Sequence, residues 1–165
     1  MKINPHLIVG LGNPDKKYEN TYHNAGFLFI DYLVSKNSVN SKLLKSDVFM
    51  NQSGSFVKKA LKKYKTKPEE LLIVHDDSDI ELGKYKISFG RSSAGHKGVE
   101  SIIESLKTKN FWRLRIGVRK TPSIKNQTPR KKAIEFVLKA ITKQDQNLLK
   151  KVFEKITLEL PYSFP

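Results

Sequence analysis

Two short apolar runs constrain the fold of this chain more than any other feature. Residues His6–Gly10 and Leu71–His75 are rich in Leu, Ile and Val, and each run ends in a glycine or a polar cluster. Strands that are buried on both faces are continuously apolar, because neither side of such a strand meets water. We therefore expect both runs to be central strands of a sheet that is covered on each face.

Further strands and helices alternate along the chain. Tyr85–Phe89 and Trp112–Val118 alternate apolar with polar residues, as half-covered strands do, and a shorter strand is expected within Leu43–Met50. Apolar residues at helical spacing predict helices over Phe56–Tyr64, Val99–Leu106, Ala133–Ile141 and Leu148–Ile156. The alternation predicts an α/β fold: a three-layer sandwich in which a mixed, twisted sheet is flanked by helices. The length of 165 residues suits one domain, and we assign residues 1–165 to it.

The segments between these elements contain cap and loop signals. Thr142 followed by Asp145 has the spacing of a capping box at the start of the last helix. A Ser/Asn/Lys stretch at Ser35–Ser41 and a polar segment at Lys120–Arg130 are expected to be surface loops.

The charge of the chain favours a polyanionic partner. Lys and Arg number 31 against 16 Asp and Glu, which gives a formal charge of +15. Nucleic acid is the leading partner class, although a genome that favours lysine and asparagine codons would produce the same excess. No apolar run approaches the ~20 residues of a transmembrane helix, so we expect no membrane partner and a cytoplasmic protein. The absence of cysteine excludes disulfides, thiolate nucleophiles and Cys-ligated zinc.

Polar residues follow the two predicted central strands. Asn13 comes after the first run and Asp76 after the second. Ligands of open α/β sheets lie beyond the carboxyl ends of the strands, so both side chains are expected to face one crevice. His23 precedes an apolar helix that begins near Phe27, and its imidazole can point back toward that crevice. A histidine held beside a carboxylate can take a proton from water, which makes His23 a candidate general base and Asp76 its orienting partner. Taken singly, each is as readily a turn or capping residue.

An amide side chain lies between a predicted strand and a predicted helix. Asn51 can donate a hydrogen bond to the tetrahedral oxyanion of ester hydrolysis, a contact worth about 3 kcal/mol of barrier. The alternative is that Asn51 and Ser53 only cap the following helix.

The sequence also contains partial signals of two other kinds of site. Gly10-Leu11-Gly12 lacks the third glycine of a dinucleotide fingerprint, since Asp15 stands in its place. The cluster of His75, Asp76, Asp77 and Asp79 offers carboxylates that suit a divalent metal, and such a site could cleave phosphodiesters. The chain has no G-x-S-x-G nucleophile elbow, so direct attack by an activated water is the simplest mechanism.

Four segments in a fixed order carry a family resemblance. Gly10–Pro14, Thr21–Gly26, Phe49–Gly54 and His75–Asp79 resemble the bacterial-type peptidyl-tRNA hydrolases, and the likeness spans about Leu7 to Val118. The resemblance implies that family's fold and the hydrolysis of the ester between a peptide, or N-blocked aminoacyl group, and tRNA. It implies that His23 is the general base, that Asp76 holds it in its basic form and that Asn13 distinguishes blocked from free aminoacyl-tRNA. No metal and no organic cofactor are expected.

The resemblance also implies a tRNA-binding surface. Tyr18, Phe49 and Asn51 match substrate contacts near the 3′ end, and Lys86 and Arg115 match basic positions that clamp the 5′ phosphate. The partner is then peptidyl-tRNA, bound at its acceptor stem and 3′ end through shape and phosphate contacts, as is usual for double-stranded RNA. We expect a role in translation and a monomeric enzyme.

Two shortened segments and the substitutions Asp15, Tyr22, Asp77 and Lys97 depart from the family pattern. Lys97, in Ala94-Gly95-His96-Lys97-Gly98, replaces a substrate-binding Asn; its ammonium can reach a carbonyl or phosphate but cannot accept a hydrogen bond. The chain is shorter than family members around Ser35–Ser46 and at the C-terminus. These departures favour a second hypothesis, a non-catalytic structured-RNA-binding protein of the same fold. A third, a metal-dependent nuclease built on the acidic cluster, predicts inhibition by a chelator.

Overall fold

The computed structural model describes residues 3–37, 39–120 and 135–160. A five-stranded sheet forms its centre, in the order β2-β1-β3-β5-β4. The first four strands in that order pair in parallel, and β4 pairs antiparallel with β5, so the sheet is mixed as expected. The strands are β1 (Leu7–Gly10), β2 (Lys42–Lys45), β3 (Leu71–Glu81), β4 (Tyr85–Phe89) and β5 (Trp112–Arg119).

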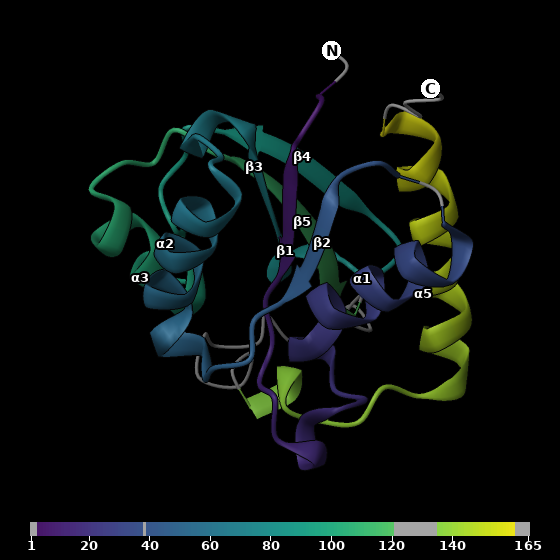
Figure 1. The fold of residues 1–165 in the computed structure, drawn as a ribbon. Coiled ribbons are helices and arrows are strands. Elements are labelled where there is room, and N and C mark those ends of the chain that lie inside the picture. The colour runs from purple at the N-terminus through teal and green to yellow at the C-terminus, as the bar shows by residue number, and fades with distance from the viewer. Residues whose placement is uncertain (1–2, 38, 121–134, 161–165) are drawn as a thin grey trace.

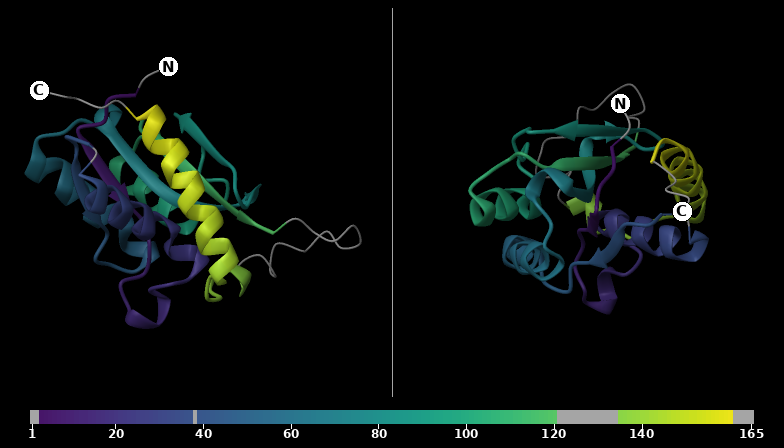
Figure 2. Two further views of the ribbon diagram at one scale, coloured as in Figure 1. Left: turned by 90° about the vertical axis from the view of Figure 1, so that its right-hand side faces the viewer. Right: turned by 45° about the horizontal axis from the view of Figure 1, so that its top comes forward.

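Helices cover both faces of the sheet (Figures 1 and 2). On one face α1 (Ala25–Lys36) and α5 (Lys143–Glu159) pack on Ile8, Leu72 and Val74. On the other, α2 (Ser53–Tyr64) and α3 (Lys97–Leu106) pack on apolar side chains of the same strands, Leu7, Val9, Leu71 and Ile73. Adjacent residues of β1 and β3 thus enter opposite cores, which explains why the two runs are apolar at every position. The three-layer α/β sandwich is confirmed.

Three of the expected element boundaries are wrong. The strand expected within Leu43–Met50 ends at Lys45, where the parallel ladder with β1 stops. Strand β3 continues past His75 to Glu81, because β5 pairs with it beyond the end of β1. In the segment expected to be a helix, Ala133–Ile141, residues 135–137 are helical and the chain leaves the helix at Leu138, while Ala133 and Ile134 lie outside the described residues. Most of the loop expected at Lys120–Arg130 also lies outside them.

The start of α5 is fixed close to the segment that carries His23. Thr142 caps the helix, as expected, by accepting a hydrogen bond from the Asp145 amide at 3.2 Å. The Asp145 carboxylate accepts a hydrogen bond from the Tyr22 hydroxyl and pairs with Lys120 at 2.9 Å. Tyr22 is buried and stacks on Phe136. The residue before His23 is therefore tied to α5 and to the segment that precedes it.

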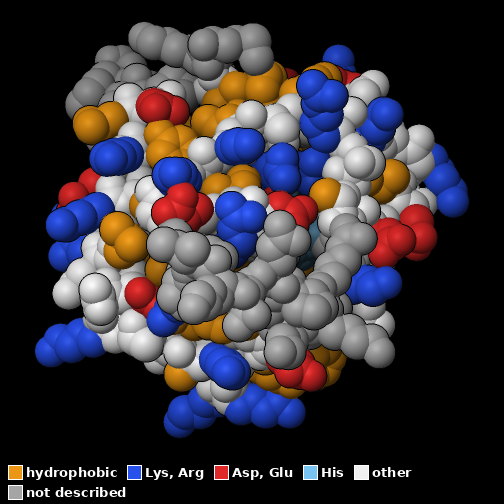
Figure 3. Space-filling model, turned by 180° about the vertical axis from the view of Figure 1, so that it is seen from behind, with side chains coloured by type: hydrophobic (Ala, Val, Ile, Leu, Met, Phe, Trp, Pro, Cys, Tyr) orange, Lys and Arg blue, Asp and Glu red, His pale blue; other side chains and the backbone are white. Residues whose placement is uncertain are grey.

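The surface has two notable properties. On the side seen from behind, Lys and Arg side chains gather near the centre of the face and outnumber the acidic ones among them (Figure 3). No helix in the described ranges combines the length and apolar character needed to cross a membrane.

Candidate active site

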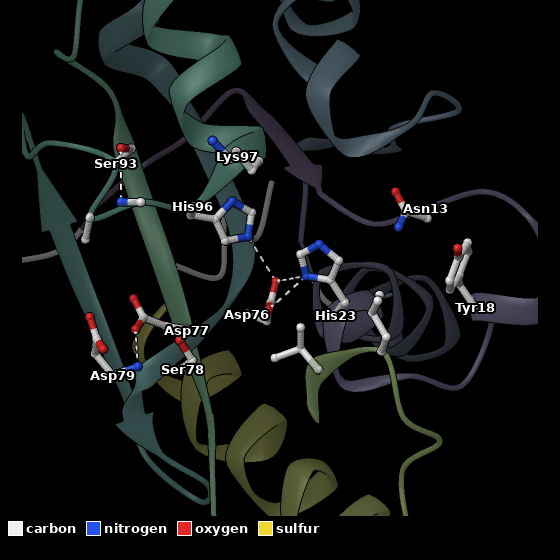
Figure 4. Close-up of a pocket in the computed structure, with 14 residues that line it drawn as sticks. Asn13, Tyr18, His23, Asp76, Asp77, Ser78, Asp79, Ser93, His96 and Lys97 are labelled. Atoms are coloured by element: carbon white, nitrogen blue, oxygen red, sulfur yellow. Dashed lines mark hydrogen bonds and ion pairs between the residues drawn. The ribbon is translucent and has the colours of Figure 1, made fainter. Parts of the chain in front are cut away.

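A cavity of about 500 Å³ opens at the carboxyl end of β1. Its walls come from the loop after β1, the turn before α1, the far half of β3, the loop before α3 and the segment before α5 (Figure 4). The lining residues are Asn13, Tyr18, His23, Asp76, Asp77, Ser78, Asp79, Ser93, Ala94, Gly95, His96, Lys97, Val137 and Leu138. Segments that are remote in sequence therefore share one pocket.

The offset between neighbouring strands exposes Asp76 to this pocket. The last pair of the β1–β3 ladder joins Gly10 to Val74, so β3 runs on without a neighbour on that side. On the other side β5 still pairs with β3, and Asp76 lies opposite Ile116. Asp76 is thus a residue inside a strand and not, as the sequence suggested, one beyond its end. It is nonetheless reached from the crevice because β1 has already stopped.

Close packing of α1 on the sheet brings His23 to Asp76. A 3₁₀ turn, Tyr22–Asn24, precedes α1 and carries His23. At Gly26, in the first turn of α1, a Cβ atom would lie 2.4 Å from the carbonyl oxygen of Val74 and 2.6 Å from that of Leu11. Because only glycine fits there, the helix approaches the strand ends closely enough for the imidazole to reach the carboxylate.

Asp76 accepts hydrogen bonds from two histidines. His23 Nδ1 lies 2.9 Å from each carboxylate oxygen of Asp76, and His96 Nε2 lies 3.0 Å from Oδ1. His96 is the N-cap of α3, where its Nδ1 accepts a hydrogen bond from the Val99 amide at 3.3 Å. This cap places the His96 proton on Nε2, facing Asp76. In His23, the proton on Nδ1 faces Asp76, which leaves the lone pair of Nε2 available to a water.

Burial and charge act in opposite directions on the pKa values of this cluster. Burial would lower the pKa of His23, but the negative charge and hydrogen bond of Asp76 outweigh it and raise that pKa above its ordinary value. Burial would raise the pKa of Asp76, yet His23 and His96 hold it well below its usual range. The carboxylate is therefore ionised throughout the physiological range. It stabilises the protonated imidazole that forms when His23 takes a proton.

His75 takes no part in the cavity wall. Its side chain is buried, its Nδ1 lies 2.6 Å from the Asp76 carbonyl oxygen, and its ring centroid lies 4.4 Å from that of His96. Burial lowers the pKa of His75 well below its ordinary value, so the ring is neutral. A neutral ring behind His96 packs against it without competing for the Asp76 carboxylate.

The amide of Asn13 is held in a fixed orientation. Asn13 follows β1, as expected, and its Oδ1 accepts a hydrogen bond from the Met50 amide at 3.1 Å. Its backbone is clamped by the Asn24 side chain, which bonds both the amide and the carbonyl of Asn13, at 2.9 and 3.0 Å. Since Oδ1 is occupied, the Nδ2 donor is the end that remains for a ligand in the cavity.

The other predicted substrate contacts lie at different distances from this centre. Tyr18 lines the cavity beside Asn13 (Figure 4). Lys97, the first residue of α3, lies at the rim with its side chain 77% exposed and its Nζ 3.5 Å from Glu100. Phe49 and Asn51 are exposed and, in the described part of the chain, are not among the lining residues. Asn51 follows Met50, whose amide holds Asn13, so the amide group expected to meet an oxyanion stands next to the pocket.

Lys86 and Arg115 are cross-strand neighbours with different surroundings. They face each other in the β4–β5 register. Lys86 is exposed, whereas Arg115 Nε lies 2.7 Å from Asp77 Oδ2 with both side chains largely buried. The positive charge of Arg115 is therefore paired with the Asp77 carboxylate. Within the acidic cluster, Asp77 also accepts a hydrogen bond from the Asp79 amide, so its carboxylate is already partnered.

Among the described residues, the group with the spacing of a metal site is His23, Asp76 and His96, and not the acidic cluster. The three ligand atoms are separated by hydrogen-bond distances of 2.9 and 3.0 Å. Nitrogen and oxygen ligands at about 2.0–2.1 Å from a tetrahedral zinc would stand about 3.3 Å apart. Binding a metal there would replace both hydrogen bonds of the carboxylate, so the donor set fits a hydrogen-bonded cluster better than a metal centre.

His96 is the residue of this site to which sequence reasoning gave no role. The signal that would have found it is local: a histidine directly before a predicted amphipathic helix is in position to be its N-cap. That signal places the ring at a helix end but does not tell that the same ring reaches Asp76, which is 20 residues away in the sequence.

Comparisons with known proteins agree in sequence and in fold. A family model described as peptidyl-tRNA hydrolase matches residues 7–164. A peptidyl-tRNA hydrolase of Mycoplasma mycoides subsp. mycoides is 39% identical, over 89% of this chain and 86% of its own length. One of Thermodesulfovibrio yellowstonii is 40% identical, over 92% of this chain and 86% of its own. A crystal structure of peptidyl-tRNA hydrolase from Acinetobacter baumannii superposes with a TM-score of 0.82 and 30% identity, covering 96% of this chain and 87% of that one.

Proposed function

The chain belongs to the peptidyl-tRNA hydrolase family, which hydrolyses the ester bond of peptidyl-tRNA, and we propose that it does so with a water molecule activated by His23. One observation carries this proposal: His23 Nδ1 lies 2.9 Å from both oxygens of Asp76. This contact fixes the imidazole tautomer whose Nε2 accepts a proton.

The proposed reaction has two steps. A water held at His23 Nε2 attacks the ester carbonyl and gives its proton to the imidazole, while Asp76 stabilises the imidazolium that results. The carbonyl oxygen becomes an oxyanion, for which the Asn13 Nδ2 and the Asn51 amide are the proposed donors. When the tetrahedral intermediate collapses, the bond to the tRNA 3′ oxygen breaks, and the imidazolium returns its proton to that oxygen. The products are a carboxylic acid, which then loses its proton to water, and a tRNA hydroxyl.

A second histidine supports the geometry of the base. His96 donates to Asp76 Oδ1 through the nitrogen that its helix cap leaves protonated. Asp76 is thus constrained from two sides, and its carboxylate cannot rotate away from His23 without losing a hydrogen bond to a charged group, worth about 1.5–3 kcal/mol. We assign His96 as a positioning residue for the His23–Asp76 pair.

The finer features of the substrate complex are also proposals. We infer that the 3′ end of tRNA lies over Tyr18, Phe49 and Asn51, with Lys97 at a carbonyl or phosphate, and that the acceptor stem follows the basic face. We also propose that the enzyme works as a monomer in the cytoplasm.

The test is the release of labelled acyl-amino acid from N-acetyl-aminoacyl-tRNA by the wild type and by His23→Ala, in the presence of a chelator. General-base catalysis contributes about 10²–10⁴-fold, so the variant should lose at least that much of kcat. Unblocked aminoacyl-tRNA is the control substrate and should remain intact. A rate in His23→Ala within about tenfold of the wild type, a barrier change of only ~1.4 kcal/mol, would remove His23 from the base role. Tight tRNA binding by the wild type without cleavage would favour an RNA-binding protein of the same fold.

A further inference from the structure

A second hollow, of about 420 Å³, adjoins the active-site cavity. It lies along the hairpin between β3 and β4 and reaches α5, and Asp79 belongs to the walls of both hollows. A ligand that fills the active-site cavity and continues past Asp79 therefore enters this second hollow. We call it the hairpin groove.

The C-terminal helix forms one wall of the hairpin groove. The Tyr85 hydroxyl donates a hydrogen bond to Glu159 Oε1 at 2.6 Å, which joins β4 to α5. In the turn between β3 and β4, a Cβ atom on Gly83 would touch Leu148 of α5 at 3.3 Å. Leu148, Lys155 and Glu159 are separated by seven and four residues and so lie on one helix face. Lys155 is therefore directed into the groove by contacts on either side of it.

Positively charged side chains outnumber negatively charged ones in the walls of the hairpin groove. Its walls contain the cations Lys84, Lys86, Arg119 and Lys155 and the carboxylates Asp79 and Glu81, a difference of two positive charges. Lys84 pairs with Glu81 at 2.7 Å. In the described part of the chain, no carboxylate lies within ion-pairing distance of Lys86, Arg119 or Lys155, which come from three different elements.

The neighbouring side chains leave these cations free for an anion. Burial and the hydrogen bond to Glu159 raise the pKa of Tyr85 to about 12, so its hydroxyl stays neutral and its proton is committed to Glu159. Arg115, the cross-strand neighbour of Lys86, is bound to Asp77. The cations that remain to meet a ligand next to Lys86 are thus Arg119 and Lys155.

We propose that Lys86, Arg119 and Lys155 bind backbone phosphates of the tRNA whose 3′ end occupies the active-site cavity. The inference rests on the proposed function. The two hollows share a wall at Asp79, so one polymer can occupy both of them. Lys and Arg side chains suit a phosphate oxygen and position the RNA without reading its sequence. Lys155 makes the C-terminal helix part of the tRNA-binding surface. Arg119 supplies a guanidinium for a phosphate, whereas the guanidinium of Arg115 is paired with Asp77.

The experiment compares Lys155→Ala and Arg119→Ala with Lys150→Ala in the full-length protein. Lys150 lies on the same helix but borders a different hollow, beside Asp31 and Tyr32, so its removal changes the net charge equally. The affinity for deacylated tRNA is measured against salt concentration. Each groove variant should flatten the slope of log K against log salt by about 0.7–0.9, the value for one phosphate contact, whereas Lys150→Ala should keep the wild-type slope. Lys155→Arg should restore it.

A second substrate separates the groove from the chemistry. N-acetyl-aminoacyl-adenosine has the ester but no acceptor stem, so Lys155→Ala should hydrolyse it at the wild-type rate while its KM for N-acetyl-aminoacyl-tRNA rises several-fold. Equal salt slopes in Lys155→Ala, Lys150→Ala and the wild type would overturn the phosphate site. Failure of the wild type to cleave either substrate would instead overturn the proposed function, and the binding slopes would still report on the groove.

Discussion

At the scale of single residues, burial and the charge of Asp76 act in opposite directions on the pKa of His23. Burial would lower the pKa of His23, and Asp76 raises it above the ordinary value. A base must be neutral to accept a proton, so activity should be present above this raised pKa and be lost as the pH falls through it. The sign for stability is opposite, since a raised pKa stabilises the fold at low pH and this contribution disappears as the pH rises.

Asp76→Asn should therefore change the rate and the pH profile together. Without the carboxylate charge, burial is the main influence left on His23, so its pKa should fall and the acid limb of kcat/KM should move to lower pH. The plateau rate should drop at least tenfold, because the tautomer and the imidazolium lose their support. Initial rates of N-acetyl-aminoacyl-tRNA hydrolysis from about pH 5 to 9 measure both. An acid limb at the same pH in both proteins would contradict the coupling.

Asn13→Asp tests the orientation of the Asn13 amide. The substituted carboxylate can still accept the hydrogen bond from Met50, but it presents an anionic oxygen where the Nδ2 donor stood. We expect kcat/KM for blocked aminoacyl-tRNA to fall at least tenfold, because a lost donor at a buried polar contact costs about 1.5–3 kcal/mol when charge is involved. Thermal unfolding of the variant should remain near the wild type. Retained activity would indicate that Nδ2 does not meet the substrate.

At the scale of elements, glycines decide how closely helices approach their neighbours. Gly26 lets α1 press onto the ends of β1 and β3, and that approach brings the His23 turn to Asp76. Gly54 has the same part in the other helical layer, where its amide bonds Ser101 Oγ at 3.0 Å. Because His96 caps the start of α3, the distance between α2 and α3 also affects the residue that holds Asp76.

Gly54→Ala should destabilise the fold although alanine is the better helix former. The helix-propensity gain is about 1 kcal/mol, but the new Cβ would stand 2.0 Å from the carbonyl oxygen of Ser101. Overpacking of this kind costs about 1–3 kcal/mol, and here it forces two backbones apart. We expect a net loss in the free energy of unfolding, measured by urea denaturation. Lys58→Ala, at an exposed position of the same helix, is the control and should change it little.

At the scale of the whole molecule, the formal charge of +15 attracts polyanions in general, while local pairing decides which cations are available to them. The Arg115 guanidinium pairs with the Asp77 carboxylate, whereas Lys86 is exposed to solvent. The charge therefore predicts that tRNA binds, and the ion pairs predict where it binds. The basic face seen in Figure 3 is consistent with a long-range attraction that is strong at low salt.

Arg115→Ala and Lys86→Ala should separate these two uses of charge. Removing Arg115 leaves Asp77 largely buried without its partner, so we expect a loss of about 2 kcal/mol in the free energy of unfolding. Lys86→Ala should leave stability unchanged and flatten the salt dependence of tRNA affinity by about one unit of slope. Urea denaturation and binding titrations measure the two effects. A stable Arg115→Ala protein that binds tRNA more weakly would instead indicate that Arg115 contacts the 5′ phosphate of the tRNA.

Much of this architecture was predictable because its signals are local. The apolar runs at His6–Gly10 and Leu71–His75 fixed which strands are central, and helical periodicity identified the layers that cover them. The expectation that Asn13, His23 and Asp76 face one crevice agrees with the cavity, although Asp76 lies inside β3 and not beyond its end. Spacing and periodicity depend on neighbours a few residues away, and they are therefore visible in the sequence itself.

Only the tertiary structure decided the rest, because it depends on pairing between remote segments. The length of β3 is set by β5, and for that reason Asp76 lies within a strand. His96 reaches Asp76, and Arg115 is taken by Asp77, through contacts that no local pattern encodes. The hairpin groove exists because α5 folds back onto the β3–β4 turn. The sequence determined the layers and the catalytic candidates, and the packing determined which charged groups remain free to meet tRNA.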